Sequence, residues 1–353
     1  MKDITIHPDA TIKEAMAILD KTAEKVLLVV DENRTLLGSL TDGDIRRHIL
    51  RGNDIGGTIQ GAFNLHPIFI FQKEYDHREI KKIFLRKKID LIPIVNQDRK
   101  VVDFVSWGKV FKNGKRRGNH DLNAPVVIMA GGRGTRLEPF TKVLPKPLIL
   151  VGEKPVIDHI IERFRDHGVR QFYLTVHHMS KIMKAYFEEK APDYSVEFAE
   201  EREPRGTAGS LTLVSEKLKT PFFLSNCDII IDADYHEIFR FHENGKYDLT
   251  LVASAKQFNI SYGICQLNGN GSLERIQEKP KYDFLVNTGL YVVNPDVIGL
   301  IPALGMFHMT DLIEKIRENG GSIGVYPVSE KAWVDVGQWD EYRNALKVME
   351  AGS

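Results

Sequence analysis

Apolar and polar positions in the first third of the chain form a pattern that occurs twice. Val26–Ile45 and Leu91–Val110 align without gaps at an offset of 65 residues, and each is typical of a strand, a polar turn, a second strand and a helix start. A helical pattern precedes each copy, at Thr11–Lys21 and His77–Lys87. Two β-β-α units packed face to face therefore predict a small α+β domain over residues 1–111.

The pattern changes after residue 111. A basic stretch at Lys112–His120, KNGKRRGNH, indicates a solvated linker over residues 112–121, with a nucleic-acid patch as the alternative. From Leu122 onward, the apolar strands VVIM, QFYLTV, VEFAEE and FFLSN alternate with the helical patterns VIDHIIERFRDHG and SKIMKAYFEEK. This alternation predicts a Rossmann-like, doubly wound α/β domain over residues 122–353, which would bind ligands at the carboxyl ends of its strands.

The later part of this domain has a different spacing. After Asp248 the segments DLTLVASA, YGICQLN, LERIQEK and FLVNTGLYVV follow one another closely. Strands that follow one another without helices between them favour antiparallel pairing, so we expect a mixed sheet. A closing helix is expected at about Gln338–Glu350.

Composition and charge narrow the class of protein. The chain is 42% hydrophobic and 27% charged, and Lys+Arg and Asp+Glu both total 48, which favours an ordinary globular protein and gives no reason to expect a nucleic-acid partner. The two cysteines, Cys227 and Cys265, are too few for a disulfide framework or a four-thiolate zinc site. The first residues lack the apolar core of a signal peptide, and apolar runs such as Val26–Val30 are too short to span a bilayer. We therefore expect a cytoplasmic protein without a membrane partner.

A glycine-rich stretch, VVIMAGGRGTRLEPFTKVLPKPL at Val126–Leu148, follows the first predicted strand of this domain. Its glycines let the backbone approach a ligand closely and turn N–H groups toward it, and its basic side chains add positive charge. A glycine loop combined with cations predicts polyphosphate binding. The glycines are Gly131, Gly132 and Gly134, and the cations are Arg133, Arg136, Lys142 and Lys146.

The stretch from Ala130 to Leu148 resembles the N-terminal signature of the sugar-1-phosphate nucleotidyltransferases. The resemblance implies that Arg133 and Arg136 serve a nucleoside triphosphate and that Lys146 contacts phosphate at the reacting centre. The motifs REPRGTAGSL, SNCD, QEKPK, VNTGLYVV and WVDVGQWDEY follow in the family's order, so the resemblance extends to about Met349.

The resemblance gives each later motif a role. Asp228 and Asp335 match the two aspartates that bind Mg²⁺, although the usual Gly-Asp pair is Asn-Cys-Asp here. Lys279 matches the lysine that contacts the sugar phosphate. The implied nucleotide-binding residues are Ala130, Gly131, Gly132, Gly134, Thr135, Glu201, Gly206, Thr207 and Ala208, and the implied sugar-binding residues are Glu278, Asn287 and Gly289.

These residues predict a phosphoryl-type transfer without a general base. A sugar 1-phosphate would attack the α-phosphorus of the triphosphate and release pyrophosphate, with positioning and charge neutralisation as the main catalytic effects. The acidic run Glu200–Glu203 suits guanine, since one carboxylate accepts two hydrogen bonds from its N1–H and N2–H₂ edge. Glu200, Glu201 and Glu203 are the candidates for that carboxylate, and alignment of this loop with the family implies Glu201. We expect GTP to be the preferred nucleotide.

The sequence GSLTDGDIRR in the first repeat resembles the nucleotide-binding element of cystathionine-β-synthase-type (CBS) domains. The resemblance implies that Thr41 and Asp44 bind an adenine nucleotide. The second copy has Ser106 and Lys109 at these positions, so a second ribose site is not expected. The alternative is a dimerisation module without a ligand, and we expect a homo-oligomer in either case.

The order of the two domains resembles the fused guanylyltransferases of bacterial legionaminic acid biosynthesis, which implies glucosamine 1-phosphate as the acceptor. Mannose 1-phosphate is the alternative acceptor, and a uridylyl- or thymidylyltransferase is the alternative within the same fold. Two other classes are a non-catalytic nucleotide sensor and a glycosyltransferase in which Asn226-Cys227-Asp228 is a degenerate Asp-x-Asp motif. Lys146 and Lys279 disfavour the glycosyltransferase, because that reaction has no attacking phosphate to hold.

Overall fold

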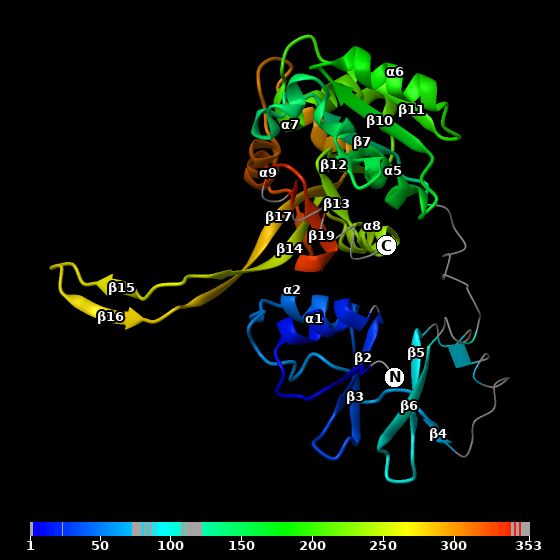
Figure 1. Cartoon of the computed structure of the whole chain (residues 1–353), viewed down its shortest axis with the longest axis vertical. Coiled ribbons are helices and arrows are strands. Elements are labelled where there is room, and N and C mark those ends of the chain that lie inside the picture. Colours follow the sequence, from blue (N-terminus) through cyan, green and yellow to red (C-terminus); the bar gives the residue numbers. More distant parts are fainter. Residues whose placement is uncertain are drawn as a thin grey trace. The chain divides into compact units, whose positions relative to one another are not determined.

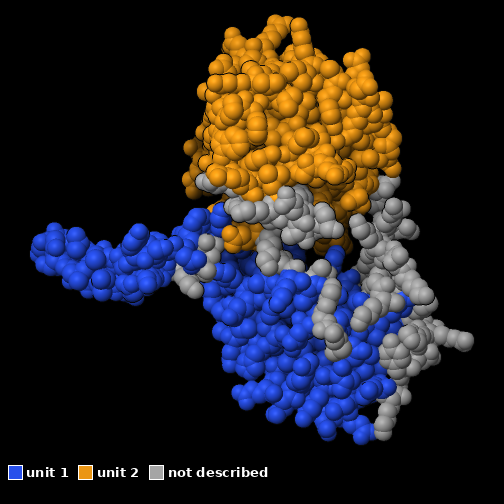
Figure 2. Space-filling view, in the orientation of Figure 1, with its two compact units in different colours: residues 1–117, 255–284 blue, residues 118–254, 285–353 orange. Residues whose placement is uncertain are grey.

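The protein is described here by a computed structural model that covers residues 3–22, 24–72, 80, 83–84, 87, 89–106, 110, 122–339, 342–343 and 346. Its contacts divide the chain into two compact units, drawn in blue and orange in Figure 2. Unit 1 comprises residues 1–117 and 255–284, and unit 2 comprises residues 118–254 and 285–353. The linker expected at 112–121 and most of the helical patterns expected at 77–87 and 338–350 fall outside the described residues.

Unit 1 contains two three-stranded sheets whose elements recur at an offset of 65 residues. In each sheet the first strand pairs in parallel with the second, and the second and third strands form an antiparallel hairpin. The register of the hairpin shifts between Val29 and Val30 in the first sheet and at the equivalent position, between Ile94 and Val95, in the second. The first sheet is β1 (Thr5–Ile6), β2 (Val26–Val30) and β3 (Leu36–Thr41), with helices α1 (Ile12–Thr22) and α2 (Asp42–Leu50); the second is β4 (Ile70–Phe71), β5 (Leu91–Val95) and β6 (Val101–Ser106).

The two repeats meet through a symmetric pair of backbone hydrogen bonds. The N–H of Leu36 donates to the carbonyl of Arg99, and the N–H of Val101 donates to the carbonyl of Arg34, both at 2.9 Å. Arg34 and Arg99 each turn the chain with a positive φ, 63° and 59°. Buried side chains from both copies also share one hydrophobic core. The predicted packing of the two copies against each other is thus confirmed for their described strands, and the helix expected at the end of the second copy lies mostly outside the described residues.

Unit 2 is built on a seven-stranded sheet (Figure 1). Its parallel centre is β7, flanked by β10 and β12, and β17 runs antiparallel to β12. The predicted doubly wound mixed sheet is therefore confirmed. In order, the strands are β11 (Ser195–Glu200), β10 (Gln171–Val176), β7 (Val126–Ala130), β12 (Phe222–Asn226), β17 (Lys281–Val293), β14 (Leu249–Asn259) and β18 (Ile323–Ser329).

Side chains of the central strand alternate between two cores, one on each face of the sheet. Val126, Ile128 and Ala130 share a core with α5 (Val156–Arg165), α6 (Ser180–Lys190) and α8 (Tyr235–Gly245). Val127 and Met129 share the other with α7 (Gly206–Gly209) and α9 (Met309–Glu318). Burial on both faces explains why VVIMA is apolar throughout, as expected for a central parallel strand.

Smaller elements complete the chain. Residues 255–284, which we expected within the second domain, are grouped with unit 1 and include the hairpin β15 (Ile264–Leu267) and β16 (Leu273–Gln277). None of the helices in the described residues is long and apolar enough to cross a bilayer. The other short strands are β8 (Leu150–Val151), β9 (Lys154–Pro155), β13 (Ile229–Ile231) and β19 (Trp333–Asp335), and the 3₁₀ turns are η2 (Thr135–Leu137), η3 (Phe140–Lys142), η4 (Lys146–Leu148), η5 (Ser210–Leu213), η6 (Ser215–Lys217), η7 (Pro295–Leu300) and η8 (Glu330–Ala332).

Candidate active site

The glycine-rich loop begins where β7 ends, at the sheet edge where β12 also ends. The two strands are parallel neighbours, with Met129 opposite Asn226. Gly134 adopts a left-handed φ of 67°, and a side chain there would lie 2.8 Å from the methyl group of Thr141, whose hydroxyl donates to the Gly134 carbonyl. Residues of the turn are accessible to a ligand: Gly132, Arg133, Thr135 and Arg136 are exposed. Ala130, at the end of the strand, is buried.

Three charged side chains meet at the carboxyl edge of this sheet. Lys146 is 9% exposed, and its Nζ donates to Oδ2 of Asp228 at 2.5 Å. The short strands β13 and β19 pair antiparallel, which places Asp335 opposite Ile229 and lets the Val336 N–H donate to the Asp228 carbonyl at 2.9 Å. The structure therefore brings together a lysine from the glycine loop and two aspartates from distant parts of the chain.

The three groups converge over Gly337. A methyl group added there would lie 2.8 Å from Oδ1 of Asp335, 2.9 Å from Oδ2 of Asp228 and 3.4 Å from Nζ of Lys146. Gly337 was not among the residues expected in the site, although it stands in the quoted motif WVDVGQWDEY. Two carboxylates around one point are a donor set that fits Mg²⁺, which binds proteins through one or two carboxylates and completes its shell with water and substrate phosphates.

Glu201 faces the start of the glycine loop. It is only 7% exposed, and a methyl group added at Gly131 would lie 2.5 Å from its Oε1. Its other oxygen accepts from the Arg205 N–H at 3.0 Å. Burial raises the pKa of Glu201, because desolvation outweighs this hydrogen bond. Its neighbour Glu200 is exposed and pairs with Lys184, so Glu201 is the acidic residue of this run that lies against the loop.

The predicted loop residues Gly206, Thr207 and Ala208 form the short helix α7. Gly206 has a φ of 78°, and a side chain there would lie 2.6 Å from the Phe307 carbonyl oxygen. The hydroxyl of Thr207 accepts from the Met309 N–H at 2.9 Å, at the first residue of α9. Ala208 is buried. These contacts hold the loop that carries Glu201 against α9.

The predicted sugar-binding residues Asn287 and Gly289 lie on β17, next to β12 in the sheet. The Asn287 side chain is fixed at both ends: its Oδ1 accepts from the Gly289 N–H at 2.9 Å and its Nδ2 donates to the Tyr291 hydroxyl at 2.7 Å. Gly289 has a φ of 87°, and a side chain there would lie 2.4 Å from Nδ2 of Asn226. Asn226, which the sequence analysis assigned no role in nucleotidyl transfer, therefore packs directly on the Asn-x-Gly motif.

Two predicted residues belong to the other unit. Glu278 and Lys279 follow β16 in unit 1, and both side chains are exposed. Lys279 has a φ of 43°, uncommon for a residue with a side chain. The carboxylate of Glu278 lies against Gly263, where an added methyl group would be 2.8 Å from Oε2. The assignments of Glu278 to the sugar and of Lys279 to its phosphate stay predictions.

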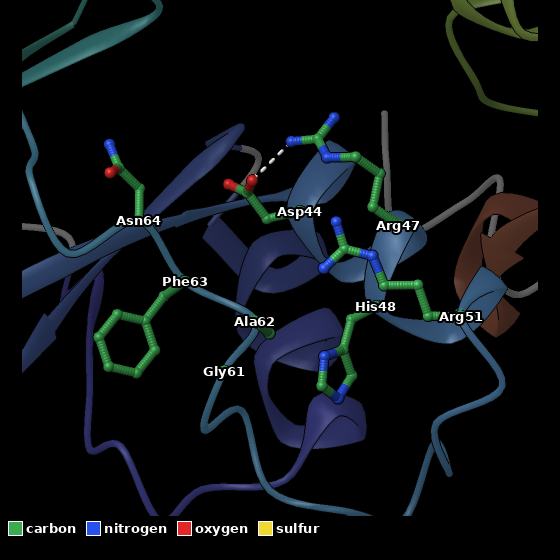
Figure 3. A pocket seen from close by; sticks show the side chains of 8 residues that line it. All are labelled: Asp44, Arg47, His48, Arg51, Gly61, Ala62, Phe63 and Asn64. Atoms are coloured by element: carbon green, nitrogen blue, oxygen red, sulfur yellow. Dashed lines mark hydrogen bonds and ion pairs between the residues drawn. The ribbon is translucent and has the colours of Figure 1, made fainter.

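The predicted CBS ligand residues lie at the start of α2. Thr41 and Asp44 form a reciprocal helix cap: the Asp44 N–H donates to the Thr41 hydroxyl, and Thr41 donates back to Oδ2 of Asp44. Asp44 also lines a cavity of about 220 Å³ (Figure 3), together with Arg47, His48, Arg51 and the segment Gly61–Asn64. Lys109 of the second copy lies outside the described residues.

Comparisons with known proteins agree with this architecture. The family profile described as Nucleotidyl transferase matches residues 125–352, and the CBS domain profile matches residues 1–51. A mannose-1-phosphate guanyltransferase of Yarrowia lipolytica is 35% identical over 223 residues, which cover 60% of each chain. The corresponding protein of Candida albicans is 38% identical over 185 residues, 50% of this chain and 51% of that one. The chain thus spans about three fifths or less of the length of these relatives.

Solved structures show the same fold. HddC from Yersinia pseudotuberculosis superimposes with a TM-score of 0.51 at 23% identity, over 64% of this chain and 99% of that one. A putative glucose-1-phosphate thymidylyltransferase from Bacillus anthracis gives a TM-score of 0.51 at 21% identity, over 64% and 95%. The Nucleotidyl transferase profile covers well over half of the sequence, and the chain belongs to the nucleotidyl transferase family.

Proposed function

We propose that this protein transfers the guanylyl group of GTP to a hexose 1-phosphate, giving a GDP-sugar and pyrophosphate. The observation that carries the proposal is the convergence of Lys146, Asp228 and Asp335 over Gly337, at the sheet edge where the glycine loop begins. A protein that only senses nucleotides does not need a buried lysine paired with one carboxylate beside a second one. A reaction between two phosphate groups needs such positive charge, because both reactants are anions, and the two carboxylates fit Mg²⁺.

In the proposed reaction, a nonbridging oxygen of the sugar phosphate attacks the α-phosphorus of GTP. The bond from the α-phosphorus to the α,β-bridging oxygen breaks, and pyrophosphate leaves with the electron pair. The attacking monoester is already ionised near neutral pH, so no side chain has to remove a proton. Catalysis then rests on position and charge neutralisation.

Each cation has a place in this scheme. Arg133 and Arg136 are exposed on the glycine loop and are suited to the β- and γ-phosphates and to the leaving pyrophosphate. Lys146 is suited to the attacking phosphate, and its ion pair with Asp228 fixes the ammonium before substrate binds. Lys279 is proposed to hold the sugar phosphate as well. When Mg²⁺ is bound by Asp228 and Asp335, it supplies positive charge to the phosphates.

The preference for guanine is proposed to come from Glu201. Its carboxylate lies against Gly131, in the loop expected to hold the base. Guanine presents the adjacent N1–H and N2–H₂ donors that a carboxylate accepts together, whereas uracil and cytosine have no such pair. The relatives from Yarrowia lipolytica and Candida albicans are named mannose-1-phosphate guanyltransferases, which supports the same choice.

Two acceptors are proposed for the sugar. Domain order resembles proteins that use glucosamine 1-phosphate, whereas the curated relatives are named for mannose 1-phosphate. The two sugars differ in the group at carbon 2 and in its stereochemistry. The fixed amide of Asn287 and the backbone at Gly289 are candidates for distinguishing them.

The test is a pyrophosphate-release assay on the full chain with Mg²⁺, across four nucleoside triphosphates and the 1-phosphates of glucosamine, mannose and glucose. We expect pyrophosphate only when both substrates are present, with GTP turned over fastest. Pyrophosphate release that is equal with UTP and GTP would refute the guanine assignment. No release with any pair, alongside measurable GTP binding, would favour the sensor.

A further inference from the structure

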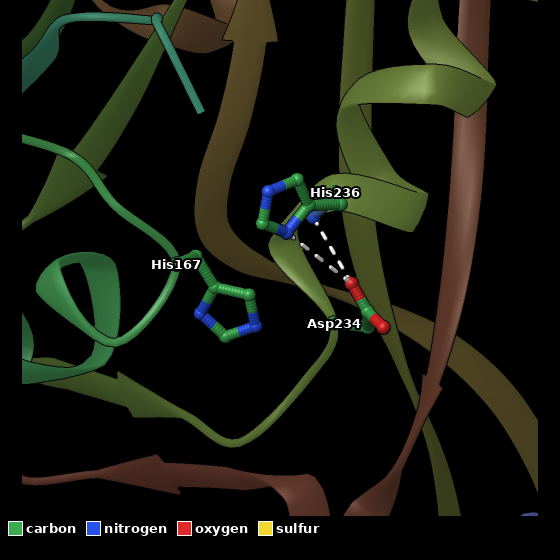
Figure 4. Close-up of side chains that lie close together, drawn as sticks. All are labelled: His167, Asp234 and His236. Carbon is green, nitrogen blue, oxygen red and sulfur yellow. Dashed lines mark hydrogen bonds and ion pairs between the residues drawn. The ribbon is translucent and has the colours of Figure 1, made fainter. Parts of the chain in front are cut away.

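A group of three side chains in unit 2 has no part in the proposed reaction. His167, Asp234 and His236 point toward one another (Figure 4), and one ligand atom from each lies within 4.8 Å of the other two. All three residues are half-buried, and the side chains of His236 and Asp234 are 25% and 35% exposed. A small ion can therefore reach the group from solvent while the protein shields part of it.

The fold fixes the positions of these residues through main-chain contacts. His167 follows the end of α5, and its carbonyl accepts from the Leu122 N–H at 3.0 Å, on the amino-terminal side of β7. The group is thus at the end of β7 away from the glycine loop. Asp234 is the N-cap of α8, and its Oδ1 accepts from the N–H groups of His236 and Glu237 at 3.1 and 3.3 Å. Such contacts pre-organise the three ligand atoms.

The hydrogen bonds also determine which nitrogen His167 presents. Its Nδ1 lies 2.9 Å from the Arg163 carbonyl oxygen. A carbonyl only accepts, so Nδ1 carries the proton and Nε2 keeps its lone pair for a ligand. Metal-binding histidines commonly donate their other ring N–H to a carbonyl in this way. On the other side, Nδ1 of His236 lies 3.9 Å from Oδ1 of Asp234.

We propose that His167, Asp234 and His236 form a metal site for Zn²⁺ or a similar divalent transition-metal ion, separate from the Mg²⁺ site proposed for catalysis. Two imidazole nitrogens and one carboxylate oxygen are a donor set for zinc, cobalt or nickel, whereas Mg²⁺ prefers oxygen ligands. Water would complete the coordination. The ion would link the end of α5 to the start of α8 and stabilise unit 2 without entering the reaction.

The test uses the full chain without a histidine tag and Co²⁺ as the probe. Saturating Mg²⁺ is present throughout to occupy the carboxylates of the catalytic site. Titration with Co²⁺ should produce d–d absorption bands that saturate at one ion per chain, and Zn²⁺ should abolish them by displacement. Substitution of His236→Ala should weaken Co²⁺ binding at least about tenfold, since the loss of second-shell partners alone costs 10–100-fold.

Asp234→Asn is the sharper variant. Asparagine is as good an N-cap as aspartate, so α8 should keep its cap while the site loses its negative ligand. Zn²⁺ should then raise the unfolding midpoint of the wild-type chain by several degrees and leave that of Asp234→Asn unchanged. His66→Ala, which removes an exposed histidine of unit 1, should bind Co²⁺ as the wild type does.

Equal Co²⁺ affinity in the wild type, His236→Ala and Asp234→Asn would overturn the proposal and leave a helix cap beside packed rings. Co²⁺ affinity that falls at least about tenfold in all three metal-site variants, His167→Ala included, and is unchanged in His66→Ala would support it. Pyrophosphate release tests the proposed reaction separately, because the metal assay does not depend on turnover.

Discussion

Each compact unit has an aspartate shortly after a strand, Asp44 after β3 and Asp228 after β12, and the two carboxylates have different kinds of partner. In unit 1, Asp44 accepts from Thr41 and pairs with Arg47 at 2.5 Å, and both partners lie three residues from it. In unit 2, Asp228 pairs with Lys146, 82 residues away, and shares the space over Gly337 with Asp335. The first arrangement is local, and the second needs the tertiary fold.

The difference indicates what each carboxylate is for. A helix cap contributes about 0.5–2 kcal/mol to stability by satisfying backbone N–H groups of its own helix. Two half-buried carboxylates placed together repel each other and lose hydration. They therefore destabilise the fold unless a cation offsets their charge. Lys146 supplies one such charge. A site that gathers charges from three segments is therefore expected to act on a ligand, whereas a ligand of Asp44 has to compete with the helix cap.

The largest expected effect is the loss of turnover in Asp228→Ala and in Asp335→Ala. Each change removes one of the two carboxylates proposed to bind Mg²⁺, and we expect the rate of pyrophosphate release to fall by at least about 10²–10³-fold. Circular dichroism and the unfolding midpoint would show that the fold persists. Asp44→Ala is the matched control, and it should leave turnover at saturating substrate unchanged.

Near-wild-type turnover of either variant at saturating Mg²⁺ would remove that aspartate from the metal site. A comparable loss in Asp44→Ala would contradict the contrast between the two units.

Lys146→Met tests the cation at the centre of the site. Methionine keeps much of the length of the side chain and removes the charge, so we expect turnover to fall by about 10²-fold. Asp228 and Asp335 would then lie near Gly337 without the ammonium that pairs with Asp228. Mg²⁺ should stabilise this variant more than the wild type, and the measurement is the unfolding midpoint with and without saturating Mg²⁺. An equal Mg²⁺-dependent shift in both proteins would contradict the proposed arrangement.

Much of the fold follows from local patterns in the sequence. The repeat predicted at an offset of 65 residues recurs in the structure, including the register shifts in both hairpins and the positive φ of Arg34 and Arg99. The alternation of strands and helices after Leu122 gave the parallel centre of the sheet correctly. These features depend on hydrophobic periodicity and turn geometry, which a single sequence contains.

The remaining features depend on contacts between distant segments. Nothing local in WVDVGQWDEY indicates that Gly337 lies under Lys146, and nothing in VNTGLYVV indicates that Gly289 leaves room for Asn226. His167 and Asp234 are likewise far apart in sequence and meet only through the fold. The cap at Thr41 is a different case, because Thr-x-x-Asp is close to the local Ser/Thr-x-x-Glu capping pattern. Thr41 and Asp44 are nevertheless predicted from the sequence only to bind a nucleotide, and the structure adds the cap.

Glu201→Gln should change base selection while it leaves the chemical step intact. Glutamine offers guanine one acceptor and a donor that faces the donors of the base, so a hydrogen bond is lost at a cost of about 1–3 kcal/mol. That predicts a fall in kcat/KM for GTP of roughly 5- to 150-fold, with little change for UTP. Unchanged selectivity, measured by competition between the two nucleotides, would exclude Glu201 as the base reader.

The same residue predicts a pH dependence. Burial raises the pKa of Glu201 above its ordinary value, so ionised Glu201 lowers the stability of the free protein at neutral pH. The fold favours the protonated form of Glu201. The stability that this form contributes is complete below the ordinary pKa of glutamate and is lost as the pH rises through the raised pKa of Glu201 in the folded protein. Glu201→Gln should therefore unfold at a higher temperature than the wild type at neutral pH, and the difference should shrink as the pH falls. A midpoint below that of the wild type at neutral pH would contradict this.

The smallest effects are expected in unit 1. Asp44→Ala removes the two hydrogen bonds that Thr41 donates to Oδ2, while the backbone N–H of residue 44 can still donate to the Thr41 hydroxyl. The change should destabilise α2 by about 1 kcal/mol, whereas Asp44→Asn keeps an accepting side chain and should cost less. Hydrogen exchange of the α2 amides measures this loss, as roughly fivefold faster exchange in the alanine variant.

The same two variants test nucleotide binding in the cavity beside Asp44. If an adenine nucleotide binds there, both variants should weaken its binding, because each removes the carboxylate that accepts from ribose hydroxyls. Calorimetry with AMP and ATP on the full chain separates the two roles. Heat with the wild type and much less with Asp44→Asn supports the ligand site, and equal heats would leave Asp44 as a helix cap alone.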